Sequence, residues 1–123
     1  MKPVSTVLEM QRTADSVRLQ GKRIGVVPTM GYLHEGHLSL IRLAKQHADV
    51  VITTIFVNPL QFAPHEDFSR YPRDIERDSC MAEEAGTDFL FIPEQHEMYS
   101  ANHLTYVQIE SLTEVLEGKI RPG

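Results

Sequence analysis

The feature that most constrains the fold of this chain is the run of residues 50–57, VVITTIFV, which is apolar or β-branched at every position. Such runs favour β-strands, because branched and aromatic side chains fit the pleated surface of a sheet. The run stops at Asn58-Pro59, since proline cannot donate to a neighbouring strand. A strand without polar alternation is typical of a parallel sheet that is covered on both faces. The run therefore predicts a buried strand.

Helical patterns alternate with further strand signals along the chain. Residues 23–27 and 88–92 predict two more strands, and residues 106–109 a short one. Three helices are predicted. The first runs from the capping-box spacing at Thr6 and Glu9 to Gly21, and the third from Pro72 to Gly86. The second begins at Gly36, with Leu40, Leu43, Ala44 and His47 on one face and Ile41 and Ala48 on an adjacent face, and a helical turn is expected over residues 113–116.

This alternation implies βαβ crossovers, and therefore an α/β, Rossmann-like three-layer domain with a mainly parallel sheet and helices on both faces. In such sheets ligands bind beyond the carboxyl ends of the strands. Two loops leave strand ends in this chain, over residues 28–37 and residues 58–71. The sequence therefore predicts that the binding site is built from these two loops.

Composition narrows the class of protein. The chain has 123 residues, enough for one domain, and 12 Lys and Arg against 17 Asp and Glu, which argues against a general nucleic-acid or membrane-surface binder. The single cysteine, Cys80, excludes an internal disulfide and is expected to pack within a helix. No segment approaches the length of a membrane span. We expect a soluble, cytoplasmic protein with no nucleic-acid or membrane partner.

The first of the two loops carries an unusual pair of histidines. In PTMGYLHEGHLSLI, residues 28–41, Gly31 and Gly36 accompany His34 and His37 where a helix begins. A zinc site of the HExxH type separates its histidines by four residues and needs further ligands, so metal ligation fits poorly and no metal site is predicted. Capping or surface histidines in an ordinary turn are a second interpretation.

A phosphate site explains more of these residues. Gly31 allows the backbone to turn and to approach an anion, and Gly36 leaves room at a helix start, where free N–H groups attract phosphate. Imidazoles at i and i+3 lie on the same face of a helix, so His34 and His37 can donate to one polyphosphate. Donors of this kind stabilise charge that develops during phosphoryl chemistry. The pattern therefore favours phosphate chemistry.

The string Thr29-x-Gly31-x-x-His34-x-Gly36-His37 resembles the HxGH signature of the nucleotidyltransferase superfamily. The longer string PTMGYLHEGHLSLI, together with IFVNPLQF, YPRDIERD and LEGKIRPG in that order, resembles the pantoate–β-alanine ligase family. The resemblance implies the HxGH type of Rossmann-like fold. It also implies that residues 1–123 are the N-terminal part of the nucleotide-binding domain and that the family's C-terminal domain is absent from this chain.

The resemblance further implies the reaction and its site. Pantoate and ATP give pantoyl adenylate, β-alanine displaces AMP, and Mg²⁺ accompanies the nucleotide; the family enzyme is expected to be a homodimer. His37 and His34 are the implied catalytic residues. The implied ATP-binding residues are Thr29, Met30, Gly31, Tyr32, Leu33, His34, Glu35, Gly36 and His37, and the implied pantoate and β-alanine ligands are Gln61, Asn58 and Tyr71. Two alternatives stay open, another HxGH nucleotidyltransferase and a non-catalytic nucleotide-binding fragment.

Overall fold

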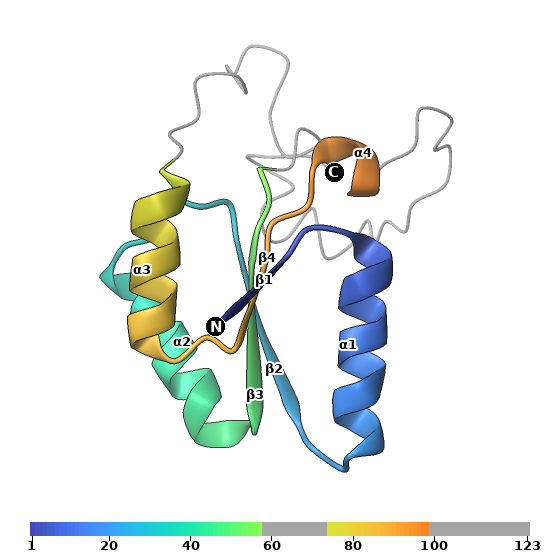
Figure 1. Ribbon diagram of the computed structural model, residues 1–123. Helices are drawn as coiled ribbons and strands as arrows, with labels where there is room; N and C mark the ends of the chain where they lie inside the picture. The colour runs from blue at the N-terminus through green and yellow to red at the C-terminus, as the bar shows by residue number, and fades with distance from the viewer. Residues whose placement is uncertain (58–73, 99–123) are drawn as a thin grey trace, which may run out of the picture.

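The computed structural model describes residues 1–57 and 74–98 and shows a parallel sheet between two layers of helices (Figure 1). Helix α1 covers one face of the sheet, and α2 and α3 lie together on the other face. The elements in chain order are β1 (Lys2–Val4), α1 (Val7–Leu19), β2 (Ile24–Thr29), α2 (Glu35–His47), β3 (Val50–Ile55), α3 (Ile75–Ala85), β4 (Phe89–Phe91) and α4 (Gln95–Met98).

The strands are ordered β1-β4-β3-β2, and all three pairings between them are parallel. Residue Ile52 at the middle of β3 lies opposite Val26 on one side and Phe89 on the other. Parallel neighbours joined by helices require crossover connections, which here run through α2 and α3. The α/β class with a parallel sheet and helices on both faces is therefore confirmed.

Strand β3 is buried on both faces, as its apolar run predicts. Val51 and Ile55 belong to a core cluster beneath α2 and α3, whereas Ile52 belongs to a second cluster on the face of α1. Val51 is 0% exposed and Ile52 only 5%. The two clusters form the two interfaces of the three-layer architecture, and they hold the strand ends in fixed positions.

The helix termini have local explanations in the sequence. The hydroxyl of Thr6 accepts from the backbone N–H of Glu9 at 3.2 Å and caps α1. Asp74 caps α3 in the same way through the backbone N–H of Arg77. Gly86 ends α3 with a φ of +115°, a left-handed conformation that costs glycine little. Helix α3 therefore begins at Ile75, three residues later than the predicted start at Pro72.

Two strand predictions were incomplete. Strand β1 was not predicted, because it is only three residues long and gains its stability from pairing with β4. Strand β2 was expected to break at Pro28, but Pro28 pairs in register with Thr54 and the strand continues to Thr29. Because β2 is an edge strand with a single neighbour, a residue without an N–H is tolerated there.

The structure decides which of the two adjacent apolar faces of α2 is buried. Ile41 is 0% exposed in the core, with Leu38 and Ala44 beside it, whereas Leu40 and Leu43 are about half exposed. The helix begins at Glu35, one residue before the predicted start, because His34 serves as its N-cap. In α3, Cys80 is exposed and does not pack in the core. The strand and helical turn predicted within residues 106–116 lie outside the described residues.

Candidate active site

The candidate site lies where β2 ends and the chain turns into α2. We call residues 30–37 the histidine loop. The end of β3, the start of α3 and the segment before α4 border the loop at the same edge of the sheet. This is the carboxyl edge, at which parallel sheets bind ligands. Because β1 and α1 precede β2, the histidine loop is the second βα connection of the sheet and not the first.

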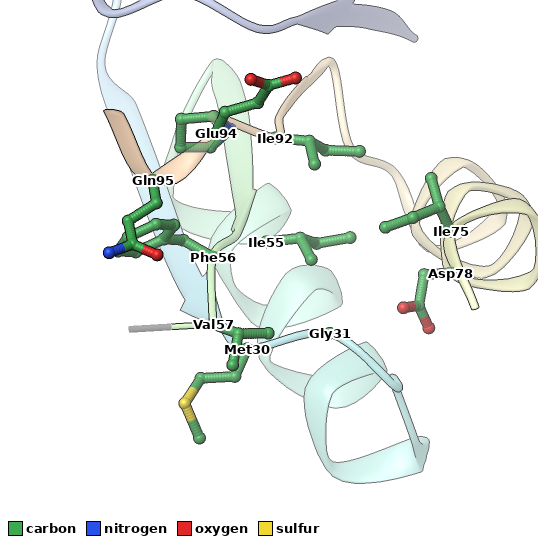
Figure 2. Close-up of a pocket in the computed structure, with 11 residues that line it drawn as sticks. Met30, Gly31, Ile55, Phe56, Val57, Ile75, Asp78, Ile92, Glu94 and Gln95 are labelled. Atoms are coloured by element: carbon green, nitrogen blue, oxygen red, sulfur yellow. The ribbon is translucent and has the colours of Figure 1, made fainter. Parts of the chain in front are cut away.

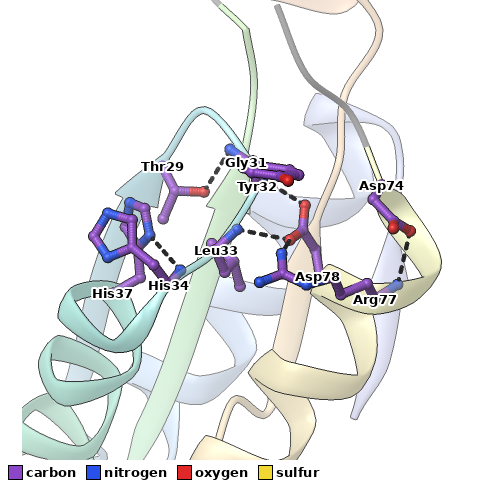
Figure 3. A network of polar contacts seen from close by, with 9 residues as sticks. All are labelled: Thr29, Gly31, Tyr32, Leu33, His34, His37, Asp74, Arg77 and Asp78. Carbon is purple, nitrogen blue, oxygen red and sulfur yellow. Dashed lines mark hydrogen bonds and ion pairs between the residues drawn. The ribbon is translucent and has the colours of Figure 1, made fainter.

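Thr29 anchors the start of the histidine loop. Its hydroxyl donates to the carbonyl oxygen of Thr54 at 2.8 Å and accepts from the backbone N–H of Gly31 at 3.1 Å (Figure 3). Gly31 has a φ of +86°, and a Cβ atom there would lie 3.1 Å from Cγ2 of Ile55. Glycine is therefore required at this turn both by its backbone conformation and by the space available.

Asp78 of α3 holds the middle of the loop. Its two carboxylate oxygens accept from the backbone N–H groups of Tyr32 and Leu33, each at 2.7 Å (Figure 3). Asp78 is 0% exposed, and Nη1 of Arg77 lies 3.6 Å from its Oδ1. The guanidinium of Arg77 also lies over the Tyr32 ring, 5.0 Å from the ring centroid. Asp78 closes the YPRDIERD segment but was not among the predicted site residues.

The two histidines form a reciprocal pair at the start of α2. Nδ1 of His34 accepts from the backbone N–H of Gly36 at 3.0 Å, and Nδ1 of His37 accepts from the backbone N–H of His34 at 3.2 Å. The ring centroids are 4.1 Å apart. Because Nδ1 is the acceptor in both rings, each neutral imidazole carries its proton on Nε2. Within the described part of the chain neither Nε2 has a hydrogen-bond partner.

The capping and phosphate interpretations of these histidines are therefore compatible. One ring nitrogen satisfies the helix terminus, and the other remains available to an anion. Gly36 makes this possible, because a Cβ atom there would lie 2.8 Å from Cε1 of His34 and 3.0 Å from its Nδ1. The glycine between the histidines therefore leaves space for the ring of His34 over the helix start.

The protonation of His37 suits the role of a neutral donor. Partial burial is the main cause that lowers its pKa below the ordinary 6.5, and the neighbouring His34 lowers it further, while the charge of Asp78 raises it. At neutral pH the ring is therefore mainly uncharged. An uncharged ring keeps Nδ1 as the acceptor for the His34 N–H and Nε2–H as a donor.

A cavity of about 330 Å³ lies next to the histidine loop (Figure 2). Most of its lining side chains are apolar, and they come from the loop, the end of β3, the start of α3 and the segment before α4. The lining residues are Met30, Gly31, Ile55, Phe56, Val57, Ile75, Asp78, Ile92, Pro93, Glu94 and Gln95. This volume suits a small molecule with an apolar part, at the low end of ordinary ligand pockets.

The predicted ATP-binding residues differ in what they present to the site. His34, Tyr32 and Glu35 are exposed, and Oε1 of Glu35 accepts from Nη1 of Arg42 at 2.6 Å. Met30 borders the cavity, whereas Leu33 is 0% exposed and points into the core. Leu33 therefore offers a ligand no side-chain surface. Asn58, Gln61 and Tyr71 lie outside the described residues.

Two further observations concern the described residues as a whole. Within residues 1–57 and 74–98 no group of three or more His, Cys, Asp or Glu side chains is arranged to hold a metal ion. None of the helices in those same ranges is long and apolar enough to cross a membrane.

Comparison with known proteins gives a consistent result. The family model for pantoate-beta-alanine ligase matches residues 2–123. A pantothenate synthetase from Chloroherpeton thalassium is 54% identical over all 123 residues, and one from Moorella thermoacetica is 57% identical. The chain covers 43% and 44% of these two proteins, respectively, so it spans less than half the length of the curated relatives.

Solved structures give the same answer. The pantothenate synthetase of Thermus thermophilus matches the whole chain with a TM-score of 0.87 at 49% identity, and the chain covers 43% of that structure. The pantoate-beta-alanine ligase of Francisella tularensis, solved in complex with beta-gamma ATP and beta-alanine, matches with a TM-score of 0.86 at 38% identity and is 47% covered. The fold is therefore the HxGH nucleotidyltransferase type of α/β domain, and the chain belongs to the pantoate-beta-alanine ligase family.

Proposed function

We propose that this chain forms the nucleotide-binding part of an ATP-dependent ligase that condenses pantoate with β-alanine. The observation that carries the proposal is the pair of imidazoles, His34 and His37, whose Nδ1 atoms cap α2 while their Nε2–H groups stay available. The family to which the chain belongs supports the choice of substrates. Residues 1–123 are then the N-terminal part of a Rossmann-like nucleotide-binding domain in a longer enzyme.

In this proposal ATP lies with its phosphates at the start of α2. The helix N-terminus and the two Nε2–H donors favour a polyphosphate there, because unpaired N–H groups and the helix dipole attract negative charge. Mg²⁺ accompanies ATP and neutralises part of its charge. In support, the related Francisella tularensis enzyme was solved with beta-gamma ATP and beta-alanine.

The proposed reaction has two steps. A carboxylate oxygen of pantoate attacks the α-phosphorus of ATP, and the bond to the bridging oxygen breaks, which releases pyrophosphate and leaves pantoyl adenylate. The amine of β-alanine then attacks the acyl carbon, and AMP leaves as the new amide bond forms and the amine loses a proton. His37, and His34 beside it, stabilise the charge that develops on the phosphate oxygens. Alignment of the reactants contributes much of the rate.

We place pantoate in the cavity next to the histidine loop. Pantoate carries two methyl groups on its central carbon, and these suit the apolar walls at Met30, Ile55 and Ile92. From there its carboxylate can face the phosphates bound by the loop. Gln61 is proposed to bind pantoate and β-alanine through its amide, which both donates and accepts hydrogen bonds. Asn58 and Tyr71 are proposed to assist it.

The proposed partners are small molecules and a second subunit, with the cytoplasm as the compartment. Apolar side chains are exposed at the β2 edge of the sheet, notably Val26 at 56%, Leu40 at 52% and Leu43 at 51%. A surface of this kind favours burial against further polypeptide, which is either a second subunit or the additional length that the relatives have. Sedimentation velocity of the full-length protein tests the homodimer.

The decisive experiment measures product formation by the full-length protein with ATP, Mg²⁺, β-alanine and one acceptor acid at a time. AMP and pyrophosphate are expected with pantoate and not with glycerol phosphate or a nicotinate-type substrate. Release of pyrophosphate with one of the other acceptors would identify a different HxGH nucleotidyltransferase. ATP binding without AMP formation under any condition would identify a nucleotide-binding module.

A variant of Gln61 tests the acceptor site separately. Replacing Gln61 by Ala is expected to raise KM for pantoate and β-alanine while ATP affinity, measured by calorimetry, stays unchanged. Weakened ATP binding with intact pantoate binding would contradict the assignment.

A further inference from the structure

Asp78 is unusual among the acidic residues of α3. Its side chain is 0% exposed, whereas Glu76, Glu83 and Glu84 lie on the exposed face of the helix. Aspartate is almost never fully buried unless it is paired. In this protein it is paired mainly with backbone, because the two shortest contacts of its carboxylate are with main-chain N–H groups.

The two N–H groups belong to a segment with an unfavourable backbone. Gly31 has a φ of +86° and Tyr32 a φ of +52°, which is the only positive φ at a non-glycine position among the described residues. A left-handed conformation is costly for a side chain such as tyrosine. The left-handed conformation of Tyr32 directs the N–H groups of Tyr32 and Leu33 to one carboxylate. Successive N–H groups in a turn form a concave site that binds an anion. Asp78 supplies the anion and stabilises this backbone.

The segment fixed by Asp78 leads directly to the histidines. Leu33 is bonded to Asp78 through its N–H and buried in the core through its side chain, and His34 follows it as the N-cap of α2. Thr29 secures the other end of the same turn through Gly31. The carboxylate of Asp78, on a different helix, therefore determines where the ring of His34 lies over Gly36. It also determines the position of His37, which is bonded to His34 (Figure 3).

We propose that Asp78 is a positioning residue for nucleotidyl transfer at the histidine loop, because its buried carboxylate fixes the backbone that places the His34 and His37 donors. This inference rests on the proposed function. Asp78 borders the cavity but is fully buried, so it acts through the loop and not by contact with the substrate. Its charge also acts on the His37 ring, whose pKa it raises against the effect of burial.

The first test compares Asp78→Asn with Asp74→Asn in the full-length protein. Asp74 is the exposed N-cap of α3, and asparagine caps as well as aspartate, so Asp74→Asn is a matched control. At position 78, asparagine keeps the shape but turns an NH₂ group toward a backbone N–H. We expect kcat to fall about 10- to 100-fold, as for displaced catalytic groups, while KM for pantoate stays within about threefold. The control should keep the parent kcat.

A second readout does not depend on activity. Nitrogen-15 NMR of the imidazoles reports the tautomer of each histidine and the pH at which it titrates. In the parent, Nδ1 of each neutral ring is expected to be the hydrogen-bond acceptor, with the proton on Nε2. In Asp78→Asn the loop is released and the charge of Asp78 near the His37 ring is lost, so the imidazole titration should differ from that of the parent and the tautomers should mix. The Asp74→Asn spectrum should match the parent.

Together the two readouts separate this inference from the proposed function. If the parent makes no AMP from pantoate but the imidazole signals change only in Asp78→Asn, the proposed reaction fails and the positioning role stands. If Asp78→Asn does not fold, Asp78→Glu replaces it, because glutamate keeps the charge but its extra methylene moves the carboxylate relative to the two backbone N–H groups; a reduced kcat in a folded variant supports the role. Parent-like kcat and parent-like imidazole titration in the folded variant would overturn it.

Discussion

The backbone N–H of His34 donates to Nδ1 of His37 at 3.2 Å, so the residue that caps α2 is itself held by the next histidine along the helix. The same ring of His37 offers its Nε2–H on the other side. A single side chain therefore combines a structural role at one nitrogen with the proposed chemical role at the other. Substitutions that mimic one nitrogen at a time can separate the two roles.

His37→Asn keeps an acceptor near the position of Nδ1 and removes the distal N–H. In the full-length protein we expect kcat for AMP formation to fall about 10²–10³-fold, as when one oxyanion donor is lost. Stability should change by less than about 0.5 kcal/mol. His37→Gln has an amide oxygen that can accept from the His34 N–H at this N3 position, as in a capping box, and an NH₂ group as donor, so it should change stability by less than about 0.5 kcal/mol and retain more activity than His37→Asn. Equal kcat in His37→Asn and the parent would leave only the capping role.

Gly36→Ala tests the space between the histidines. In an ordinary helix this change stabilises by about 0.5–1 kcal/mol. At this position the new Cβ would lie 2.8 Å from Cε1 of His34, so the ring must move away from the helix start. We expect no gain in stability and a fall in kcat of at least about 10-fold. Gln46→Ala, on the exposed surface of the same helix, is the control and should keep full activity.

The lowered pKa of His37 predicts a pH dependence of stability. At a pH between the pKa of His37 in the folded protein and 6.5, the unfolded chain binds more protons than the folded one. The contribution of His37 to the free energy of unfolding is therefore fully present above pH 6.5 and is lost as the pH falls through the pKa of the folded state. Protonation of Nδ1 also removes the acceptor for the His34 N–H. Urea unfolding should show that the free energy of unfolding falls less between about pH 8 and about pH 5 in His37→Asn than in the parent. The same dependence of unfolding free energy on pH in the two proteins would contradict the role of His37 in this pH dependence.

The buried face of α2 can be tested on the chain itself. Ile41 is 0% exposed and Leu40 is 52% exposed, although the two are neighbours. Ile41→Ala should reduce the free energy of unfolding by about 2–5 kcal/mol, as for other large-to-small core changes. Leu40→Ala in the 123-residue chain should cost less than about 1 kcal/mol. A comparable loss in both variants would mean that another part of the chain covers Leu40.

The sequence was sufficient for the features that depend on local patterns. The apolar run of residues 50–57 predicted a strand buried on both faces, and the i and i+3 spacing correctly placed the rings of His34 and His37 side by side. Capping by the histidines was only the second interpretation, because serine, threonine, aspartate and asparagine are the preferred caps, but His34 is the N-cap of α2. The buried face of α2 could not be chosen from the sequence because Leu40 and Ile41 are equally apolar, so periodicity alone allowed either of two adjacent faces.

Asp78 could not be identified from the sequence for a different reason. It is one of several acids on α3, and nothing within its own helix distinguishes it from Glu76. Its role arises from contacts with residues 45 and 46 positions earlier in the chain. Local propensity carries no information about contacts at that separation, and they become visible only when the sheet brings the two segments together.

That separation has a consequence for the order in which the molecule forms during synthesis. The histidine loop lies in the first third of the chain, but the carboxylate that stabilises its left-handed turn is made 45 residues after Leu33. A nascent chain that ends before α3 therefore has both histidines but not the carboxylate that fixes the loop before them. The amide protons of Tyr32 and Leu33 should exchange with solvent each time α3 detaches, so the loop shares the local unfolding equilibrium of that helix.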